Sequence, residues 1–171
     1  MKKLKVTARA KWIAACTVLA AASLVGAPAF AATSTSTATF AVTATVNAAC
    51  TISATSLAFG TYASTAATAQ SSITVTCSNT TAYNVGLNQG STTGATVTTR
   101  QMTGPSGATL NYALYQNSGL TTNWGNTAGT DTVSGTGNGA AQTLTVYGQI
   151  AGGQFPAAGS YTDTVTATVY Y

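Results

Sequence analysis

Charged side chains are scarce in this sequence of 171 residues, which holds six Lys and Arg, two Asp, and no Glu or His. Five of the six basic residues precede position 12, so beyond Ala31 only Arg100, Asp131 and Asp163 are charged. Nothing there neutralises phosphates, so nucleic-acid binding and anionic-membrane binding have no electrostatic support. The usual general bases and nucleophile activators are missing as well, and we expect neither an enzyme nor a bound cofactor.

The early basic residues belong to a pattern that is typical of a secretory signal peptide. They precede an apolar stretch, WIAACTVLAAASLVG, and a small-x-small site at residues 29–31. The apolar stretch is too short to span a membrane. We therefore predict a signal peptide over residues 1–31, cleaved after Ala31, and an exported mature chain with no direct membrane insertion.

Cysteine is also rare, and the first of the three, Cys16, lies within the predicted signal peptide. Cys50 and Cys77 remain in the exported chain, where oxidising conditions favour a disulfide. A metal site would lack ligands, because the mature chain has no His, no Glu and no third Cys. We predict a structural disulfide between Cys50 and Cys77 and no metal site.

Helical periodicity is absent from the mature chain, where short runs instead alternate apolar and polar residues. These runs are Ser71–Cys77, Tyr83–Gln89, Leu110–Gln116, Thr143–Ile150 and Tyr161–Tyr171. The region Asn123–Ala140 is rich in turn residues, and Asp131–Val133 is its candidate for a short edge strand. Together with the abundant Thr and Val, the pattern predicts an all-β sandwich of short strands.

The stretch TATFAVTATVNAAC, residues 37–50, places Phe40, Val42 and Ala44 on alternate positions behind a low-complexity leader. Alternation alone favours an ordinary first strand that pairs within its own chain. The second interpretation is a strand given to another molecule. An uncharged β-edge without Lys or Glu is open to strand addition, and this sequence has almost no charge to guard its edges.

Taken in order, several segments resemble the spore coat protein U domain family, whose members include subunits of archaic chaperone-usher pili. The matching segments are FAVTATVNAACTISATSLAFGTY (40–62), ITVTCS (73–78), YNVGLNQG (83–90), RQM (100–102), LNYALYQN (110–117), W-G (124–125), LTVYGQI (144–150) and PAAGSYTDTVTATVYY (156–171). They cover nearly the whole mature chain.

The resemblance implies an immunoglobulin-like sandwich that is incomplete, with its final strand supplied in trans. A periplasmic chaperone would lend that strand first, and the N-terminal extension of the next pilus subunit would replace it at an outer-membrane usher. The resemblance also divides the chain into a donor-strand extension, residues 32–44, and a pilin domain, residues 45–171, whose first strand is expected near Thr45.

The donor role would fall on Phe40, Val42 and Ala44. The acceptor groove and chaperone-contacting strand would consist of Val165, Ala167, Val169, Tyr170 and Tyr171. The sequence stops at Tyr171 after an apolar-faced run, and we expect that face to need a cover. Burying each larger donor side chain would contribute roughly 1.5 to 3 kcal/mol. The sequence alone does not decide whether a chain inserts its extension into its own groove or into that of another copy.

Three single residues have two interpretations each. Asp163 either pairs with Arg100 or turns to solvent. Trp124 either anchors a loop on the sandwich rim or offers a surface for sugar stacking, with anchoring favoured. Tyr161 either forms a tyrosine corner or simply begins a strand.

The sequence thus favours an exported structural subunit of a surface pilus that contributes to adhesion or biofilm. Its partners would be identical or related subunits, the chaperone and the usher. The alternative is a secreted coat protein of a cell or spore surface that forms no filament. A tip adhesin is disfavoured, because the mature chain leaves no room for a second domain.

Overall fold

The computed structural model describes residues 33–171, so the predicted signal peptide lies outside the described residues. The chain divides into two units, one ending at Thr43 and one beginning at Ala44. In the first unit, residues 33–43 are exposed and form no helix or strand. No helix within residues 33–171 has the length and apolar character needed to cross a membrane.

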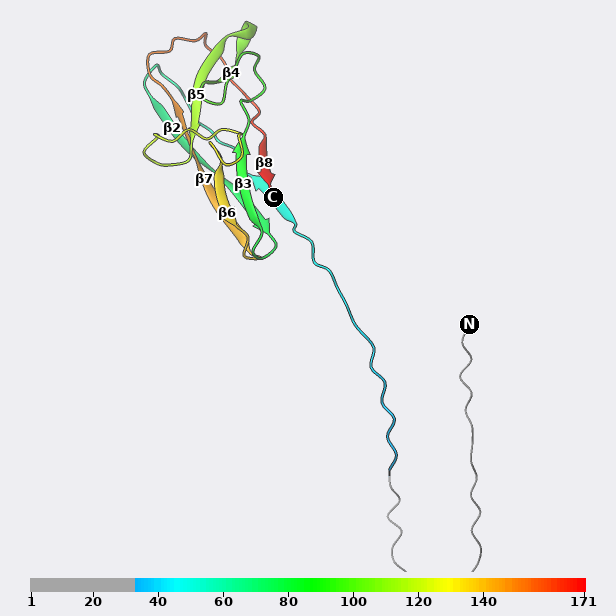
Figure 1. The fold of residues 1–171 in the computed structure, drawn as a ribbon. Helices are drawn as coiled ribbons and strands as arrows, with labels where there is room; N and C mark the ends of the chain where they lie inside the picture. Colours follow the sequence, from blue (N-terminus) through cyan, green and yellow to red (C-terminus); the bar gives the residue numbers. More distant parts are fainter. Residues whose placement is uncertain (1–32) are drawn as a thin grey trace, which may run out of the picture. The chain divides into compact units, whose positions relative to one another are not determined.

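The second unit is built from strands that form two antiparallel sheets (Figure 1). The strands are β1 (Cys50–Ala54), β2 (Ala67–Cys77), β3 (Ala82–Leu87), β4 (Arg100–Thr103), β5 (Thr109–Tyr115), β6 (Val133–Thr136), β7 (Ala141–Ile150) and β8 (Ala167–Tyr170), with a short 3-10 turn at Pro105–Gly107. One sheet has the order β1-β2-β7-β5-β4 and the other the order β6-β3-β8. The predicted all-β, immunoglobulin-like sandwich is therefore confirmed.

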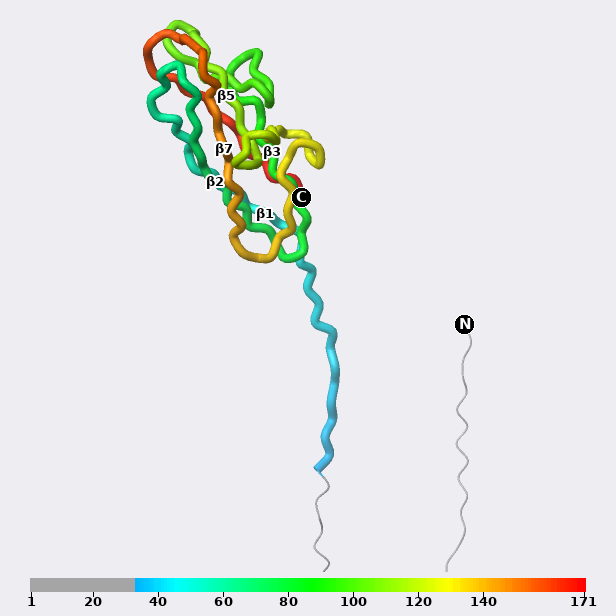
Figure 2. The backbone as a smooth tube through the Cα atoms, turned by 90° about the vertical axis from the view of Figure 1, so that its left-hand side faces the viewer, coloured from blue at the N-terminus to red at the C-terminus, as the bar shows by residue number. Residues whose placement is uncertain are grey.

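The core lies between the two sheets and follows the period-two pattern of the sequence. Each central strand contributes every second side chain, because alternate residues of a strand point to opposite faces. The buried apolar residues are Ile73, Val75 and Cys77 of β2, Tyr83, Val85 and Leu87 of β3, Leu110, Tyr112 and Leu114 of β5, Val146 and Ile150 of β7, and Trp124. β2 and β7 form the longest strand pair of the larger sheet (Figure 2).

Two strands differ from the expectation. The first strand was expected near Thr45, but β1 begins at Cys50. Residues 45–49 are exposed, and the carbonyl of Ala49, next to β1, accepts from the Ser78 amide just beyond the end of β2. The run 161–171 was expected to be one strand, but only Ala167–Tyr170 forms a ladder. Before it, Thr162 pairs with Thr103 of β4, whereas the carbonyl of Thr166 accepts from the Asn88 amide after β3. The segment thus passes from one sheet to the other.

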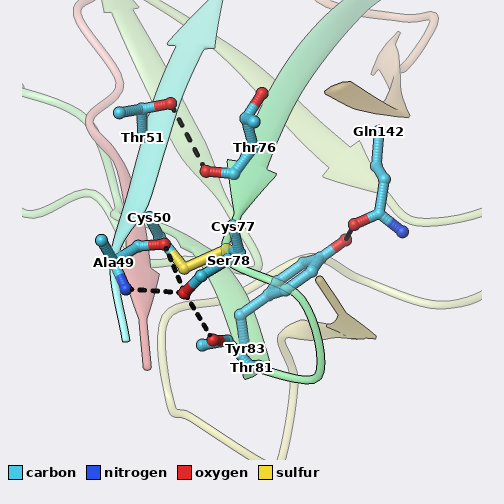
Figure 3. The surroundings of a disulfide bond; sticks show 9 residues. All are labelled: Ala49, Cys50, Thr51, Thr76, Cys77, Ser78, Thr81, Tyr83 and Gln142. Atoms are coloured by element: carbon cyan, nitrogen blue, oxygen red, sulfur yellow. Dashed lines mark hydrogen bonds between the residues drawn. A yellow bond between two sulfur atoms is a disulfide. The ribbon is translucent and has the colours of Figure 1, made fainter. Parts of the chain in front are cut away.

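The sandwich has two ends, which we call the disulfide end and the loop end. At the disulfide end, Cys50 and Cys77 form the disulfide that the sequence predicted, with an S–S distance of 2.03 Å. The amide of Ala49 donates to the Ser78 hydroxyl at 3.0 Å next to it (Figure 3). The loop end carries the loops 55–66 and 151–160, since β2 begins and β7 ends there, with Ala67 paired to Ile150.

Replacing both Cys50 and Cys77 with Ala should lower the free energy of unfolding by about 3 to 4 kcal/mol. The disulfide has a sequence separation of 27 residues, and opening it restores that loop's entropy to the unfolded chain. Chemical denaturation measures the change, and the wild-type protein with its disulfide reduced is the control. Equal stability of the oxidised and reduced wild-type proteins would contradict the prediction.

Candidate functional site

An open groove lies on one side of the sandwich. Its volume is about 280 Å³. One wall is formed by residues 54–59, which follow β1, and the other by residues 161–167, which lead into β8. The floor consists of core side chains, namely Ile73, Leu87, Met102, Tyr112, Leu114 and Val146. Apart from Met102, these floor side chains are at most 7% exposed, and the accessible apolar surface of the groove comes from partly buried wall residues such as Leu57, Phe59 and Val165.

The strands beside the groove are both sheet edges. β1 is the outermost strand of the larger sheet and β8 the outermost strand of the smaller one. Within residues 33–171, β1 pairs only with β2, and β8 pairs only with β3. Each edge therefore leaves backbone N–H and C=O groups available for one further strand.

The predicted groove residues lie on or next to this wall. Val165 and Ala167 line the groove, whereas Val169 packs against the core without lining it. Tyr170 is 36% exposed and donates its hydroxyl to the Asn126 side-chain oxygen at 3.0 Å. Tyr171 is 63% exposed.

The predicted donor residues are accessible. Phe40 is 87% exposed and Val42 83% exposed, and Ala44 is exposed as well. Val46, the next residue on the same alternate positions, is 88% exposed. Large apolar side chains exposed to this extent are unusual in a soluble protein, and a run of them indicates a binding segment.

Asp163 is the only charged group that lines the groove. One carboxylate oxygen accepts from the Tyr112 hydroxyl at 2.6 Å, and the other accepts from the Ser91 amide and hydroxyl and from the Thr164 amide. Partial burial acts to raise the pKa of Asp163, but the hydrogen bonds from Tyr112 and Ser91 outweigh it, so the pKa lies below its usual value. For Tyr112, burial and the Asp163 carboxylate raise the pKa, so its hydroxyl stays protonated as a donor.

Arg100 does not pair with Asp163. Its side chain is fully buried and donates to four backbone carbonyl oxygens at 2.6 to 2.9 Å. The acceptors are the carbonyls of Leu87, Asn88, Val97 and Trp124. Burial lowers the pKa of Arg100, although a guanidinium remains charged in proteins. No feature of the sequence indicates that this cation bonds to main chain rather than to a carboxylate.

Two aromatic residues hold loops against the sandwich through hydrogen bonds to main chain. Trp124 is 1% exposed and donates its indole N–H to the Val85 carbonyl at 2.8 Å, which confirms the loop-anchor interpretation. The Tyr161 hydroxyl donates to the Ala157 carbonyl four residues upstream at 2.7 Å, the hydrogen bond of a tyrosine corner. In residues 33–171, no group of three His, Cys, Asp or Glu side chains could hold a metal ion.

Comparison with known families matches residues 36–168 to the model of the Spore Coat Protein U domain. The chain belongs to the spore coat protein U domain family. Its match begins at residue 36, so the exposed segment from Phe40 to Val46 falls within the region that the family describes. A comparison with curated protein sequences gives no match.

Among solved structures, this spore coat U domain is similar to a chain of the CsuC-CsuE chaperone-tip adhesion subunit pre-assembly complex. That complex comes from the archaic chaperone-usher Csu pili of Acinetobacter baumannii. The sequences are 30% identical and the TM-score is 0.55. The similarity covers 74% of this chain and 40% of the other, so this chain spans less than half the length of its relative.

Exchanging Arg100 for Ala should lower the free energy of unfolding of this spore coat U domain by more than about 3 kcal/mol, because four main-chain carbonyls, two of them in buried hydrogen bonds, lose a charged donor. Arg100→Lys should be intermediate, since an ammonium cannot reach all four. Gln101→Ala, the next residue on β4, is the control, and denaturant unfolding is the measurement. Unchanged stability in both Arg100 variants would contradict the buried role.

The free energy of unfolding should also decrease as the pH falls below about 4. The pKa of Asp163 is lower in the folded chain, so its stabilisation is fully present above the unfolded pKa and is lost as the pH falls through the folded one. Asp163→Asn should flatten this dependence, and Tyr112→Phe should flatten it in part. Denaturation series from pH 2 to pH 7 measure it, and an acid slope in Asp163→Asn equal to that of the wild type would refute the assignment.

Proposed function

We propose that this protein is a structural subunit of a surface pilus, assembled by the chaperone-usher route through donor-strand exchange, and that it contributes to adhesion or biofilm. The observation that carries the proposal is the groove between β1 and β8. It has an apolar lining and lies beside two strands that are each unpaired on one side. One added strand would cover this lining and pair with a strand edge.

The chain carries a segment suited to that groove. Phe40, Val42 and Ala44 alternate with Thr and Ala, so an extended segment would direct all three into the groove and leave its polar positions outside. Burying Phe40 and Val42 contributes roughly 1.5 to 3 kcal/mol each, and main-chain hydrogen bonds add to it. Fixing each residue costs about 1 to 2 kcal/mol, so the register has to bring several side chains into the groove at once.

On the acceptor side, we assign Val165 and Ala167 to the wall that receives the donor. Val169, Tyr170 and Tyr171 continue the same segment and are assigned to the contact with a periplasmic chaperone. The exposure of Tyr171 and the half-exposed Tyr170 support this assignment, because both are available to a partner before assembly.

The other partners follow from the family and from the similar structure, whose title names a chaperone and a pilus subunit. We propose identical or related subunits, a periplasmic chaperone and an outer-membrane usher as partners. The chain would be exported through the periplasm to the cell surface, where its role is structural rather than catalytic. The second candidate is a secreted coat protein that forms no filament, which the family description itself favours.

A synthetic peptide spanning Ser36 to Val46 should bind the mature chain, residues 32–171. At a concentration near 100 times its Kd, the peptide adds about 2.7 kcal/mol of stability, or roughly 5 to 10 °C in Tm. It should also convert multimers of the chain into monomers with one peptide each, because it competes with the extension of the next copy. Light scattering measures the mass and calorimetry the Tm.

Two altered peptides make the test specific. Asp at positions 40 and 42 should abolish binding, whereas Asp at positions 41 and 43 should preserve it, because those side chains would face away from the groove. A chain that stays monomeric and responds to none of the three peptides would rule out donor-strand exchange and favour the coat protein.

A further inference from the structure

The loop from Ala151 to Ser160 presents an aromatic side chain to solvent in a fixed position. Phe155 is 85% exposed at the loop end of the sandwich. The residue before it, Gln154, pairs with the main chain of β5: its side-chain oxygen accepts from the Asn111 amide at 2.8 Å, and its side-chain nitrogen donates to the Asn111 carbonyl at 2.9 Å. The Tyr62 hydroxyl accepts from the Gln154 amide at 3.1 Å and donates to the Ala151 carbonyl at 2.8 Å.

These bonds hold the loop before Phe155, Pro156 restricts the backbone directly after it, and the bond from the Tyr161 hydroxyl to the Ala157 carbonyl holds the loop further on. An aromatic side chain on a rigid backbone loses little conformational entropy when it binds, so it is suited to a contact surface. The hydrogen bonds do not by themselves require an aromatic residue at the tip. Its exposure therefore needs another explanation, and a partner is the simplest one.

The loop lies where the groove opens. A second hollow of about 730 Å³ lies between residues 57–64 and residues 156–161. It shares four lining residues with the groove, namely Leu57, Phe59, Met102 and Tyr161. The groove therefore continues toward the loop end and emerges beside the loop that carries Phe155.

The length of the chain between the donor segment and β1 limits the position of a neighbouring copy. Only residues 47–49 separate Val46 from Cys50, the first residue of β1. At 3.3 to 3.6 Å per residue, Val46 and Cys50 can be at most about 14 Å apart. The disulfide end of the donating copy must therefore lie within about 14 Å of the point where its donor strand leaves the groove of the accepting copy.

The strand direction selects the end of the groove. β1 runs toward the loop end and β8 toward the disulfide end, so the direction of a donor is set by the strand with which it pairs antiparallel, and here that strand is taken to be β8, whose segment is assigned to receive the donor. A donor antiparallel to β8 ends at the loop end, because β8 runs from Ala167 toward the disulfide end. We propose that Phe155 of one copy packs against the disulfide end of the next copy, on residues 44–50, 77–82 or 137–141. This contact rests on the proposed donor-strand exchange and adds a second point of attachment between subunits.

The test places the photoreactive analogue benzoylphenylalanine at position 155 of the mature chain and mixes isotopically light and heavy copies. After assembly and irradiation, we expect crosslinks between light and heavy chains that mass spectrometry maps to residues 44–50, 77–82 or 137–141. The control carries the analogue at Ser118, which is exposed on the outer face of β2 and β7 and should give no such crosslinks.

The outcomes separate the two proposals. Polymers that form without these crosslinks, or with crosslinks to other surfaces, overturn the role of Phe155 and leave donor-strand exchange intact. A wild-type chain that forms no polymers overturns the exchange, and the proposed contact with it. Phe155→Ser should still polymerise, since the groove is unchanged, but its filaments should lose stiffness, seen in electron micrographs as a shorter persistence length. Equal persistence lengths would count against the contact.

Discussion

The hydrogen-bonding capacity of two strand edges governs this structure. β1 and β8 belong to different sheets, and each has one side without a partner strand in the described part of the chain. The apolar groove lies between the segment that follows β1 and the segment that leads into β8, and its floor side chains Ile73, Leu87 and Leu114 are themselves buried. Unpaired strand edges and an apolar groove thus lie next to each other. A single extended segment would pair with an edge and cover the groove, whereas a globular partner would leave the strand edges unpaired.

The fold keeps this side open without collapsing, since the rest of the sandwich is held by strong internal bonds. Arg100 joins the end of β3, the following loop and the segment at Trp124 through four carbonyls. The Tyr112 hydroxyl and Ser91 hold Asp163 at the edge of the groove. These bonds tie the wall at residue 163 to β5 and to the loop after β3. The groove is therefore formed by fixed elements before any strand enters it, which reduces the entropy lost on binding.

Period-two alternation predicted the strands that form the core, because their burial depends on side-chain position within one strand. The disulfide followed from composition and export. Neither signal revealed the path of residues 161–166, which depends on contacts with Thr103 and Asn88 far away in sequence. The role of Arg100 was equally hidden, since its partners are main-chain atoms that have no sequence signature. The loop around Phe155 was missed as well, because Gln154 pairs with main chain rather than with a side chain.

Strand direction also bears on whether a chain can fill its own groove. Residues 47–49 allow at most about 14 Å between Val46 and Cys50. A donor antiparallel to β8 would place Val46 at the loop end, beyond Ala54. Cys50 lies at the disulfide end, and four residues of β1, or about 13 Å, already separate it from Ala54. The connection is too short for one chain to span. Insertion into its own groove would instead require a tight hairpin with β1, in which the segment runs antiparallel to β1 and parallel to β8. The short connection therefore excludes self-insertion in the direction assigned to the donor, antiparallel to β8.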